Sequence, residues 1–177
     1  MKIINCRLPN VYEIYTKRFS DSRGSFTEAF NSKEIKNITG KEFKVCQVNK
    51  SISKKGVLRG LHFQKNSPQS KIVLVTKGRI QDVIVNIDKK SKYFGKFETF
   101  DISSKKGNCL FIPSNYAHGF LALDDLNEVI YLVDEFWDQK DEKTLMYNDK
   151  ELNIDWALKD NLNLSKKDLN GINLGSL

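Results

Sequence analysis

The two histidines, His62 and His118, are the side chains of this sequence best suited to acid–base chemistry. They are the only histidines among 177 residues, and each lies in or beside an apolar, strand-like run. Imidazole exchanges a proton near neutral pH more readily than other side chains do. His62 is therefore a candidate general base, although a core histidine satisfied by one hydrogen bond explains its position equally well from the sequence alone.

Three further residues carry groups that could take part in such chemistry. Tyr131 lies in an apolar run, Lys71 opens another, and Asp168 follows Ser165 by three positions. A core tyrosine, a lysine reaching outward from a strand end and a helix-capping acid are the simpler explanations. Taken singly, these residues leave their roles open.

Metal chemistry is disfavoured by the ligands that the sequence offers. A transition-metal site usually needs three or four convergent His, Cys or carboxylate ligands. The chain has no His-x-His or Cys-x-x-Cys pair, and Cys6, Cys46 and Cys109 lack metal-type spacing. We therefore expect no metal ion, with the three cysteines as plain thiols in a reducing cytoplasm. A glycine-rich phosphate loop and a nucleophile elbow are also missing.

Composition predicts one soluble globular domain over residues 1–177. The chain is 40% hydrophobic and 29% charged, with a formal net charge of +7. Its basic residues are scattered in pairs with acids between them, which favours a solvated surface over a nucleic-acid patch. No run approaches the ~20 apolar residues of a membrane helix, and the N-terminal apolar stretch is too short for a signal peptide.

Short apolar runs separated by turn signals indicate an all-β sandwich or small barrel. We expect strands at 57–64, 71–77, 80–87, 97–102, 109–112, 118–123 and 128–133. Gly78 predicts a tight hairpin tip between the second and third of these. Short helices are expected at 31–38 and 164–168, the second beginning near a capping box at Ser165. The polar tail after Asn170 is expected to fray.

Strand parity sets an expectation for the His62 segment. In a regular strand, His62 shares a face with Gly60, while Arg59 points to the opposite face. A bulge at Gly60 would re-aim Arg59.

The order of several motifs resembles the dTDP-4-dehydrorhamnose 3,5-epimerase family. The most specific segments are RGLHFQ at 59–64, followed by Lys71, and IPxxxAHGF at 112–120, followed by Tyr131. FxDxRGxFxE at 19–28, QxN at 47–49, YNDxxLxIxW at 147–156 and LSxxD at 164–168 also fit. The resemblance covers nearly the whole chain.

The resemblance implies a cupin-like double-stranded β-helix, or jelly roll, that forms a homodimer, and a cofactor-free enzyme acting on a nucleotide sugar. An apolar segment at 11–15 also suggests strands exchanged within a twofold dimer. By resemblance, His62 is the base, Asp168 orients it and Tyr131 is the proton donor. Arg59, Lys71 and His118 inherit substrate contacts, and Arg23, Phe26, Gln47 and Asn49 inherit contacts to the nucleotide or the neighbouring subunit.

Acid–base chemistry on a 4-keto sugar fits these assignments, because the carbonyl acidifies the C–H bonds at C3 and C5. The expected reaction inverts both carbons of a dTDP-linked 4-keto-6-deoxyhexose. A monofunctional 3-epimerase or a 3,4-ketoisomerase on a related sugar is the alternative enzyme. A non-enzymatic sugar-binding jelly roll is a third possibility, which the combination of base, acid and orienting residue disfavours.

The sequence departs from the family pattern in four places, which together involve six residues. Leu132 replaces a lysine, Phe136 and Trp137 replace two tyrosines, and Val48 replaces an acid. A Val-Asp-Ile-Arg pattern appears as residues 85–88, with Asn86 and Asp88 at its polar positions. We expect these changes to affect the choice of sugar or nucleotide rather than the catalytic residues.

Overall fold

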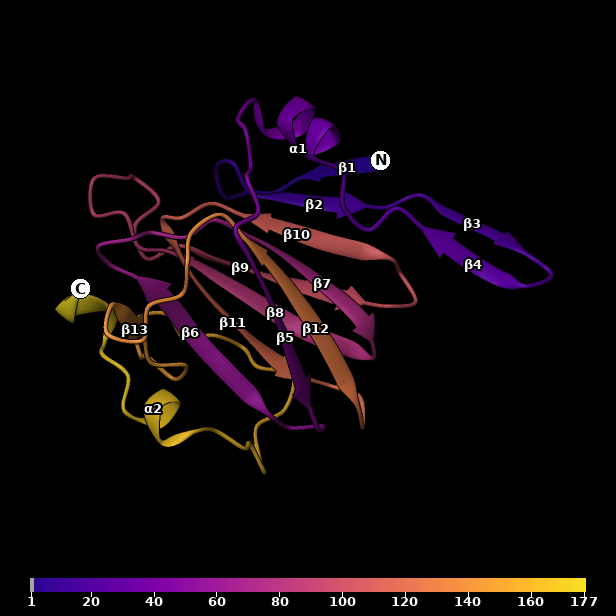
Figure 1. Ribbon diagram of the computed structural model, residues 1–177. Helices are drawn as coiled ribbons and strands as arrows, with labels where there is room; N and C mark the ends of the chain where they lie inside the picture. Colours follow the sequence, from indigo (N-terminus) through magenta and orange to yellow (C-terminus); the bar gives the residue numbers. More distant parts are fainter. Residues whose placement is uncertain (1) are drawn as a thin grey trace.

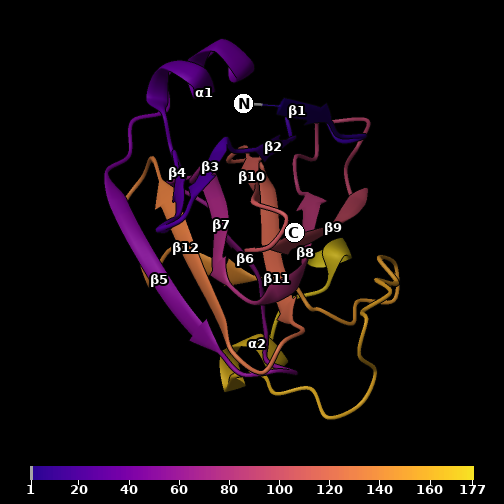
Figure 2. The same ribbon diagram turned by 90° about the vertical axis from the view of Figure 1, so that its right-hand side faces the viewer.

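Two antiparallel sheets face each other in the computed structural model, which describes residues 2–177 (Figures 1 and 2). One sheet has the order β1 (Lys2–Asn5), β2 (Tyr12–Tyr15), β10 (Asn108–Ile112), β7 (Lys71–Lys77), β12 (Asn127–Val133) and β5 (Gln47–Ser53). The other has the order β13 (Glu142–Thr144), β6 (Leu58–Gln64), β11 (Tyr116–Ala122), β8 (Arg79–Asn86) and β9 (Phe97–Ser103). The expected cupin-like jelly roll is confirmed.

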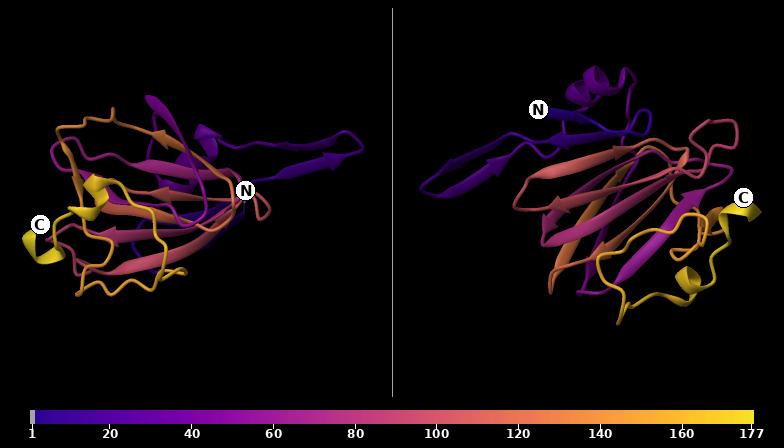
Figure 3. Two further views of the ribbon diagram at one scale, coloured as in Figure 1. Left: turned by 90° about the horizontal axis from the view of Figure 1, so that it is seen from below. Right: turned by 180° about the vertical axis from the view of Figure 1, so that it is seen from behind.

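The remaining elements lie outside these two sheets. The hairpin of β3 (Arg18–Asp21) and β4 (Gly24–Thr27) extends away from the body (Figure 3). Helix α1 (Ser32–Thr39), helix α2 (Lys166–Leu169) and the 3₁₀ helix η1 (Leu174–Ser176) are short. No helix in the part of the chain that the structure describes is long and apolar enough to cross a membrane.

Alternate residues of the strands build a core between the two sheets. Val73 and Val129 of the six-stranded sheet pack in one buried cluster with Ile84 and Phe120 of the five-stranded sheet. Because side chains along a strand alternate in direction, the intervening apolar residues need cover on the outer faces. The two sheets therefore need further layers outside them.

Segments at the two ends of the chain supply those layers. The outer face of the five-stranded sheet, including Leu61 and Val83, packs against Trp156 and Leu174 of the C-terminal segment. The outer face of the six-stranded sheet packs against α1, where Ile35 is buried in a cluster with Ile72 and Leu132. Burial on both faces explains why the central strands read as nearly continuous apolar runs.

The predicted strands all form, with small shifts at their ends. The sequence pattern did not reveal β1, β3, β4, β5 and β13, because these strands are short or largely exposed. In β5 the usual pattern is inverted. Val48 and Ile52 are exposed, whereas the polar Gln47, Asn49 and Ser51 are half-buried.

The hairpin predicted at Gly78 is wrong. Strands β7 and β8 belong to different sheets, so Gly78 lies where the chain crosses from one sheet to the other. Its φ of +83° is the positive angle that glycine tolerates, and a Cβ there would lie 2.5 Å from the Leu126 carbonyl oxygen. A positive φ shows a tight turn but does not show which strands the turn joins.

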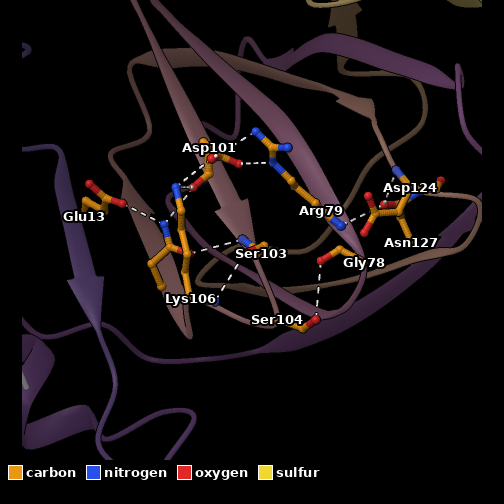
Figure 4. Close-up of polar contacts among 10 residues, drawn as sticks. Glu13, Gly78, Arg79, Asp101, Ser103, Ser104, Lys106, Asp124 and Asn127 are labelled. Atoms are coloured by element: carbon orange, nitrogen blue, oxygen red, sulfur yellow. Dashed lines mark hydrogen bonds and ion pairs between the residues drawn. The ribbon is translucent and has the colours of Figure 1, made fainter.

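Polar residues hold the strands together around this crossover (Figure 4). Asn108 Nδ2 donates to Glu13 Oε1 at 2.7 Å and to the Asp101 carbonyl at 2.9 Å. Arg79 Nε donates to Asp101 Oδ1 at 2.7 Å, and the Lys106 ammonium donates to Asp101 Oδ2 at 2.6 Å. The contacts join β2, β8, β9 and β10 at the end of the sandwich where β7 finishes.

Both predicted helices are confirmed, but the expectation of a frayed tail is wrong. Asn31 caps α1, and Ser165 caps α2 by accepting from the Asp168 backbone N–H. The Ile172 N–H donates to the Thr144 carbonyl at 2.8 Å, and Leu174 is buried. The apolar residues of this short tail dock it onto the sheet. That residues 1–177 form one domain stays a prediction.

Candidate active site

A cleft of about 360 Å³ opens between the two sheets, and most of the predicted site residues line it. The six-stranded sheet contributes Asn49, Ser51, Lys71 and Tyr131. The five-stranded sheet contributes Arg59, His62, His118 and Glu142. Trp137, in the loop after β12, also lines the cleft.

His62 is held by a carboxylate from a distant part of the chain. Its Nε2 lies 2.5 Å from Asp168 Oδ1, and the Ser165 hydroxyl donates to Asp168 Oδ2 at 2.8 Å. Burial acts to raise the pKa of the Asp168 carboxyl, but the hydrogen bonds with His62 and Ser165 and the nearby positive charge of Lys167 together leave that pKa below its ordinary value. An ionised carboxylate only accepts hydrogen bonds, so the Nε2 of His62 carries the proton and Nδ1 has the free lone pair.

Asp168 therefore combines the two roles that the sequence left open. Its backbone N–H is the group that the Ser165 cap satisfies, while its side chain binds His62. The helix is short, but Asp168 is almost fully buried against β6.

Tyr131 reaches the cleft from the sheet opposite His62. Its hydroxyl lies 3.2 Å from Ser51 Oγ, and its ring meets the His118 ring edge-on with centroids 6.2 Å apart. Burial raises the pKa of Tyr131 well above its ordinary value, and the Ser51 hydrogen bond offsets only part of this. The phenol thus keeps its proton at neutral pH.

His118 is buried and paired with Asp82. Its Nε2 lies 2.7 Å from Asp82 Oδ2, and Asp82 is fully buried with no hydrogen-bond partner for Oδ1 within the described residues. A buried carboxylate needs nearby cations or donors. His118 and the neighbouring Lys71 provide them.

Lys71 is buried, so the expectation of an outward-reaching strand-end lysine does not hold. Its side chain lines the cleft and the residue is only 8% exposed. Burial lowers the pKa of Lys71 from 10.5 to about 8, although the charges of Glu142, Asp82 and Asp134 oppose the change. The ammonium is a dehydrated cation facing the cleft, which makes its electrostatic effect on a bound ligand large.

A β-bulge brings Arg59 and His62 onto the same side of β6. His62 pairs with His118 and Arg59 pairs with Phe120, so two residues of β6 oppose Gly119 of β11 alone. Of the two alternatives that the sequence left open for Arg59, regular alternation and a bulge at Gly60, the structure shows the bulge. Arg59 Nε donates to Ser53 Oγ at 3.0 Å, which fixes the guanidinium at the edge of the cleft.

Gln47 and Asn49 lie on the polar side of β5. Gln47 Nε2 donates to Asn49 Oδ1 at 2.7 Å, and Gln47 Oε1 accepts from the Trp137 backbone N–H at 3.0 Å. Asn49 and Trp137 line the cleft, while Gln47 links them from behind. These contacts hold Trp137 in place at the opening of the cleft.

Arg23 and Phe26 are the two predicted site residues that one copy of the chain does not bring to the cleft. Both lie on the projecting β3–β4 hairpin (Figure 3). Phe26 is 70% exposed, and its ring lies 6.5 Å from that of Phe19. Arg23 forms a bidentate pair with Asp21 on the surface.

Sequence reasoning missed three polar residues of the site. Glu142 Oε1 lies 3.7 Å from His62 Nδ1, and the Lys167 ammonium pairs with Glu142 Oε2. Ser51 binds the Tyr131 hydroxyl, and Asp82 binds His118. Asp82 could have been recognised from the sequence, because it is an acid inside the apolar run 80–87. Glu142 could not, because it lies in a segment with many other charged residues.

The departures from the family pattern fall in different environments. Leu132 faces away from the cleft and packs under α1, and Val48 is exposed on the outer side of β5. Asn86 is fully buried, and Phe136 is exposed. Trp137 is the only changed residue among those that line the cleft in the described chain. No group of three or more His, Cys, Asp or Glu suited to a metal ion occurs in residues 2–177.

Comparisons with known proteins agree with this site. The family model of dTDP-4-dehydrorhamnose 3,5-epimerase matches residues 5–175. The enzyme of that name from Shigella flexneri is 39% identical, covering 97% of this chain and 94% of the relative. Its counterpart from Methanothermobacter thermautotrophicus is 38% identical, with coverages of 96% and 92%.

Solved structures give the same result. The 3,5-epimerase from Legionella pneumophila in complex with dTDP-4-keto-L-rhamnose has a TM-score of 0.96 and 34% identity, covering 98% of this chain and 93% of its own. A 3'-monoepimerase from Streptomyces bikiniensis in complex with dTDP-quinovose has a TM-score of 0.91 and 26% identity, with coverages of 96% and 86%.

Fold, cleft and relatives together define a cupin-like isomerase of sugar nucleotides. The chain belongs to the dTDP-4-dehydrorhamnose 3,5-epimerase family. Its relatives support dTDP-sugar 3,5-epimerase activity and a nucleotide-sugar substrate.

Proposed function

We propose that this protein inverts C3 and C5 of dTDP-4-dehydro-6-deoxyglucose, giving dTDP-4-dehydrorhamnose, without a metal or cofactor. One observation carries the proposal. His62 and Tyr131 face one cleft from opposite sheets. A sugar ring between the sheets therefore has a base on one face and an acid on the other, which is the arrangement that inversion of a carbon requires.

His62 is the proposed general base. Its Nε2–H is committed to Asp168, so Nδ1 accepts the proton from the carbon next to the 4-keto group. Asp168 fixes the ring and its tautomer and stabilises the imidazolium that forms, as the orienting acid of a catalytic triad does. Glu142, 3.7 Å from Nδ1, adds negative charge on the same side as the incoming proton.

Enolate stabilisation is assigned to Lys71 and His118, which line the cleft. As the C–H bond breaks, its electron pair moves toward C4 and negative charge develops on the keto oxygen. Lys71, buried and facing the cleft, and the paired His118 are the groups placed to stabilise that charge. Cations held in a low-dielectric site need no reorganisation during the reaction.

Reprotonation is assigned to Tyr131. Its phenol stays protonated at neutral pH and lies on the opposite sheet from His62. Transfer of its proton to the carbanion carbon gives the inverted centre. Proton exchange with solvent then returns both groups to their starting states. Inversion at both carbons requires the ring to reposition between two such rounds.

Nucleotide binding is assigned to the mouth of the cleft. Arg59 can present its guanidinium to the diphosphate, since arginine forks match phosphate oxygens. Gln47, Asn49 and Trp137 form the adjoining polar and aromatic wall. The replacement of a family tyrosine by Trp137 is the departure with the most direct access to the ligand.

A twofold dimer would complete this site. The β3–β4 hairpin projects from the body with two exposed phenylalanines, and we propose that it packs on a second copy. Arg23 and Phe26 would then reach the partner's cleft. Light scattering at micromolar concentration should give a dimer, and the Phe19→Ser, Phe26→Ser variant should shift it toward monomer. A parent protein that is a stable monomer would contradict the proposed assembly.

The cofactor-free part of the proposal has its own test. Activity should persist after exhaustive chelation and dialysis, because the proposed proton transfers use side chains alone. A stoichiometric metal whose removal abolishes turnover would overturn this part.

A monofunctional 3-epimerase is the second candidate, favoured by the likeness to the monoepimerase structure and by Trp137 at the cleft. Turnover in heavy water separates the two. A double epimerase places solvent deuterium at both C3 and C5 of the sugar, and we expect this result. Label confined to C3 at full turnover would assign the chain to the monofunctional class.

A further inference from the structure

A second cleft lies on the outer side of the five-stranded sheet. Its volume is about 490 Å³, compared with about 360 Å³ for the cleft between the sheets. It is bounded by the end of β6, the loops after β8 and β10, strand β13 and the C-terminal tail, which lies beside β6 and β13 in Figure 1. Small-molecule sites have volumes of roughly 300–1,000 Å³.

The inner walls of this outer cleft are apolar. Phe63 and Ile87 line it from the sheet side, and Ile172 lines it from the tail. Ile172 is 38% exposed although it belongs to a packed backbone bridge, so its side chain leaves apolar surface in contact with solvent. A flat apolar body in the cleft would remove that surface from water.

The rim of the outer cleft is basic. Lys65, Lys89 and Lys143 are exposed around it, and their ammonium groups form no ion pair within residues 2–177. Asp88 is the only acidic side chain among the residues described there, and its Oδ1 accepts from the Lys90 backbone N–H at 2.9 Å. Three unpaired cations outnumber the two carboxylates at the cleft, the engaged one of Asp88 and the terminal one of Leu177, and this balance favours a negatively charged ligand.

The outer cleft and the candidate active site share the same two strands. On β6, His62 faces the active site and Phe63 faces the outer cleft; on β13, Glu142 and Lys143 divide in the same way. Gln64 lines the outer cleft and also donates to the Phe136 carbonyl at 3.1 Å and accepts from the Asp138 N–H at 2.8 Å. It thus holds the loop that carries Trp137 into the active site.

We propose that the outer cleft is a second binding site, for a small organic anion with a flat apolar body. The body packs on Phe63, Ile87 and Ile172, and the negative group lies at the lysine rim. This goes beyond the proposed function and does not depend on it, because no residue assigned to catalysis or nucleotide binding lines the outer cleft.

The test uses the fluorescent aromatic sulfonate 8-anilinonaphthalene-1-sulfonate as the probe. Its binding to the parent protein is titrated with and without saturating thymidine diphosphate, the nucleotide part of the substrate proposed for the active site. The probe should still bind when the nucleotide is present. The Lys65→Glu, Lys89→Glu variant should weaken this remaining binding about tenfold. The matched control Lys54→Glu, Lys55→Glu makes the same change in net charge on the turn before β6 and should leave it unchanged.

A second variant tests the position of the site. Ser176→Trp places an indole in the outer cleft and should abolish probe binding, with a melting temperature close to that of the parent. Three results would overturn the proposal. These are displacement of all probe by thymidine diphosphate, equal weakening in the two charge variants, and undiminished binding in a folded Ser176→Trp protein.

Discussion

Asp168 Oδ1 lies 2.5 Å from His62 Nε2, although 106 positions separate the two residues in the chain. The contact exists because the C-terminal segment wraps the outer face of the five-stranded sheet and seats α2 beside β6. The proposed base thus depends on a segment that belongs to neither sheet. Comparing variants of the two residues separates the contribution of the base from that of its orienting acid.

His62→Ala should lower kcat/KM by about 10²–10⁴-fold or more, because the proposed general base is lost. Asp168→Asn should cost less, since the imidazole stays in place with its tautomer no longer fixed. Ser165→Ala, which removes only the hydroxyl that holds Asp168, should cost least. Steady-state kinetics of the purified variants, with melting curves as the control for folding, measure this order. Near-normal turnover by the His62 variant would refute the assignment.

The burial of Lys71 predicts how the stability of the protein changes at alkaline pH. Burial lowers the pKa of Lys71 from 10.5 to about 8, so the folded protein loses this proton before the unfolded chain does. Between those values the unfolded state binds more protons, and the free energy of unfolding therefore rises with pH by an amount on the order of 3 kcal/mol from this group. Below pH 8 both states are protonated and the whole burial penalty remains.

Deprotonation of Lys71 should lower the activity, although it raises the free energy of unfolding. The kcat/KM of the parent should fall as pH rises through about 8, because the neutral amine no longer stabilises the enolate. Lys71→Met should be nearly inactive, and its unfolding free energy should be flatter between pH 8 and 10. Lys77→Met, at the exposed end of the same strand, is the matched control. A parent profile that stays flat to pH 10 would contradict the role of Lys71.

Tyr131→Phe should separate proton exchange from inversion. His62 still removes a proton and returns one from its own face, so deuterium enters the sugar, while inversion falls by about 10²-fold or more without the opposite donor. Mass spectrometry of the sugar and chromatography of the epimers measure the two outcomes. Tyr147→Phe, which lies outside the cleft, should change neither. Equal loss of exchange and inversion would argue against Tyr131 as a separate acid.

The close packing around Gly60 predicts that a side chain there would destabilise the protein. The φ of Gly60 is +116°, and a Cβ would lie 2.5 Å from Gly119 Cα and 2.7 Å from the His118 carbonyl oxygen. Gly60→Ala should therefore cost about 3 kcal/mol or more and displace Arg59 from the cleft. Gly40→Ala is the matched control, since a Cβ there meets no atom within 4 Å and only its positive φ is strained, at about 1–2 kcal/mol. Denaturant unfolding measures the free energy of unfolding of both variants. Equal losses of stability would show that the bulge is not tightly packed.

The sequence by itself determined the class of fold and the family. Apolar runs at strand length, broken by turn residues, locate the central strands because burial on both faces demands apolar side chains at successive positions. The RGLHFQ and IPxxxAHGF segments identify the family from residue types alone. His62, Lys71 and His118 could be recognised in this way because they lie inside those strands or open them.

Only the tertiary structure decided which residues meet. Residue spacing gives the face of a strand but not its sheet, so the sequence could not show that Gly78 lies at a crossover or that Tyr131 faces His62 across a cleft. Glu142 lies in a charged surface-like segment, and β5 points its polar residues inward. All these residues are positioned by pairing between strands that lie far apart in the sequence. The contacts that stabilise such pairing are not visible in any short stretch of sequence.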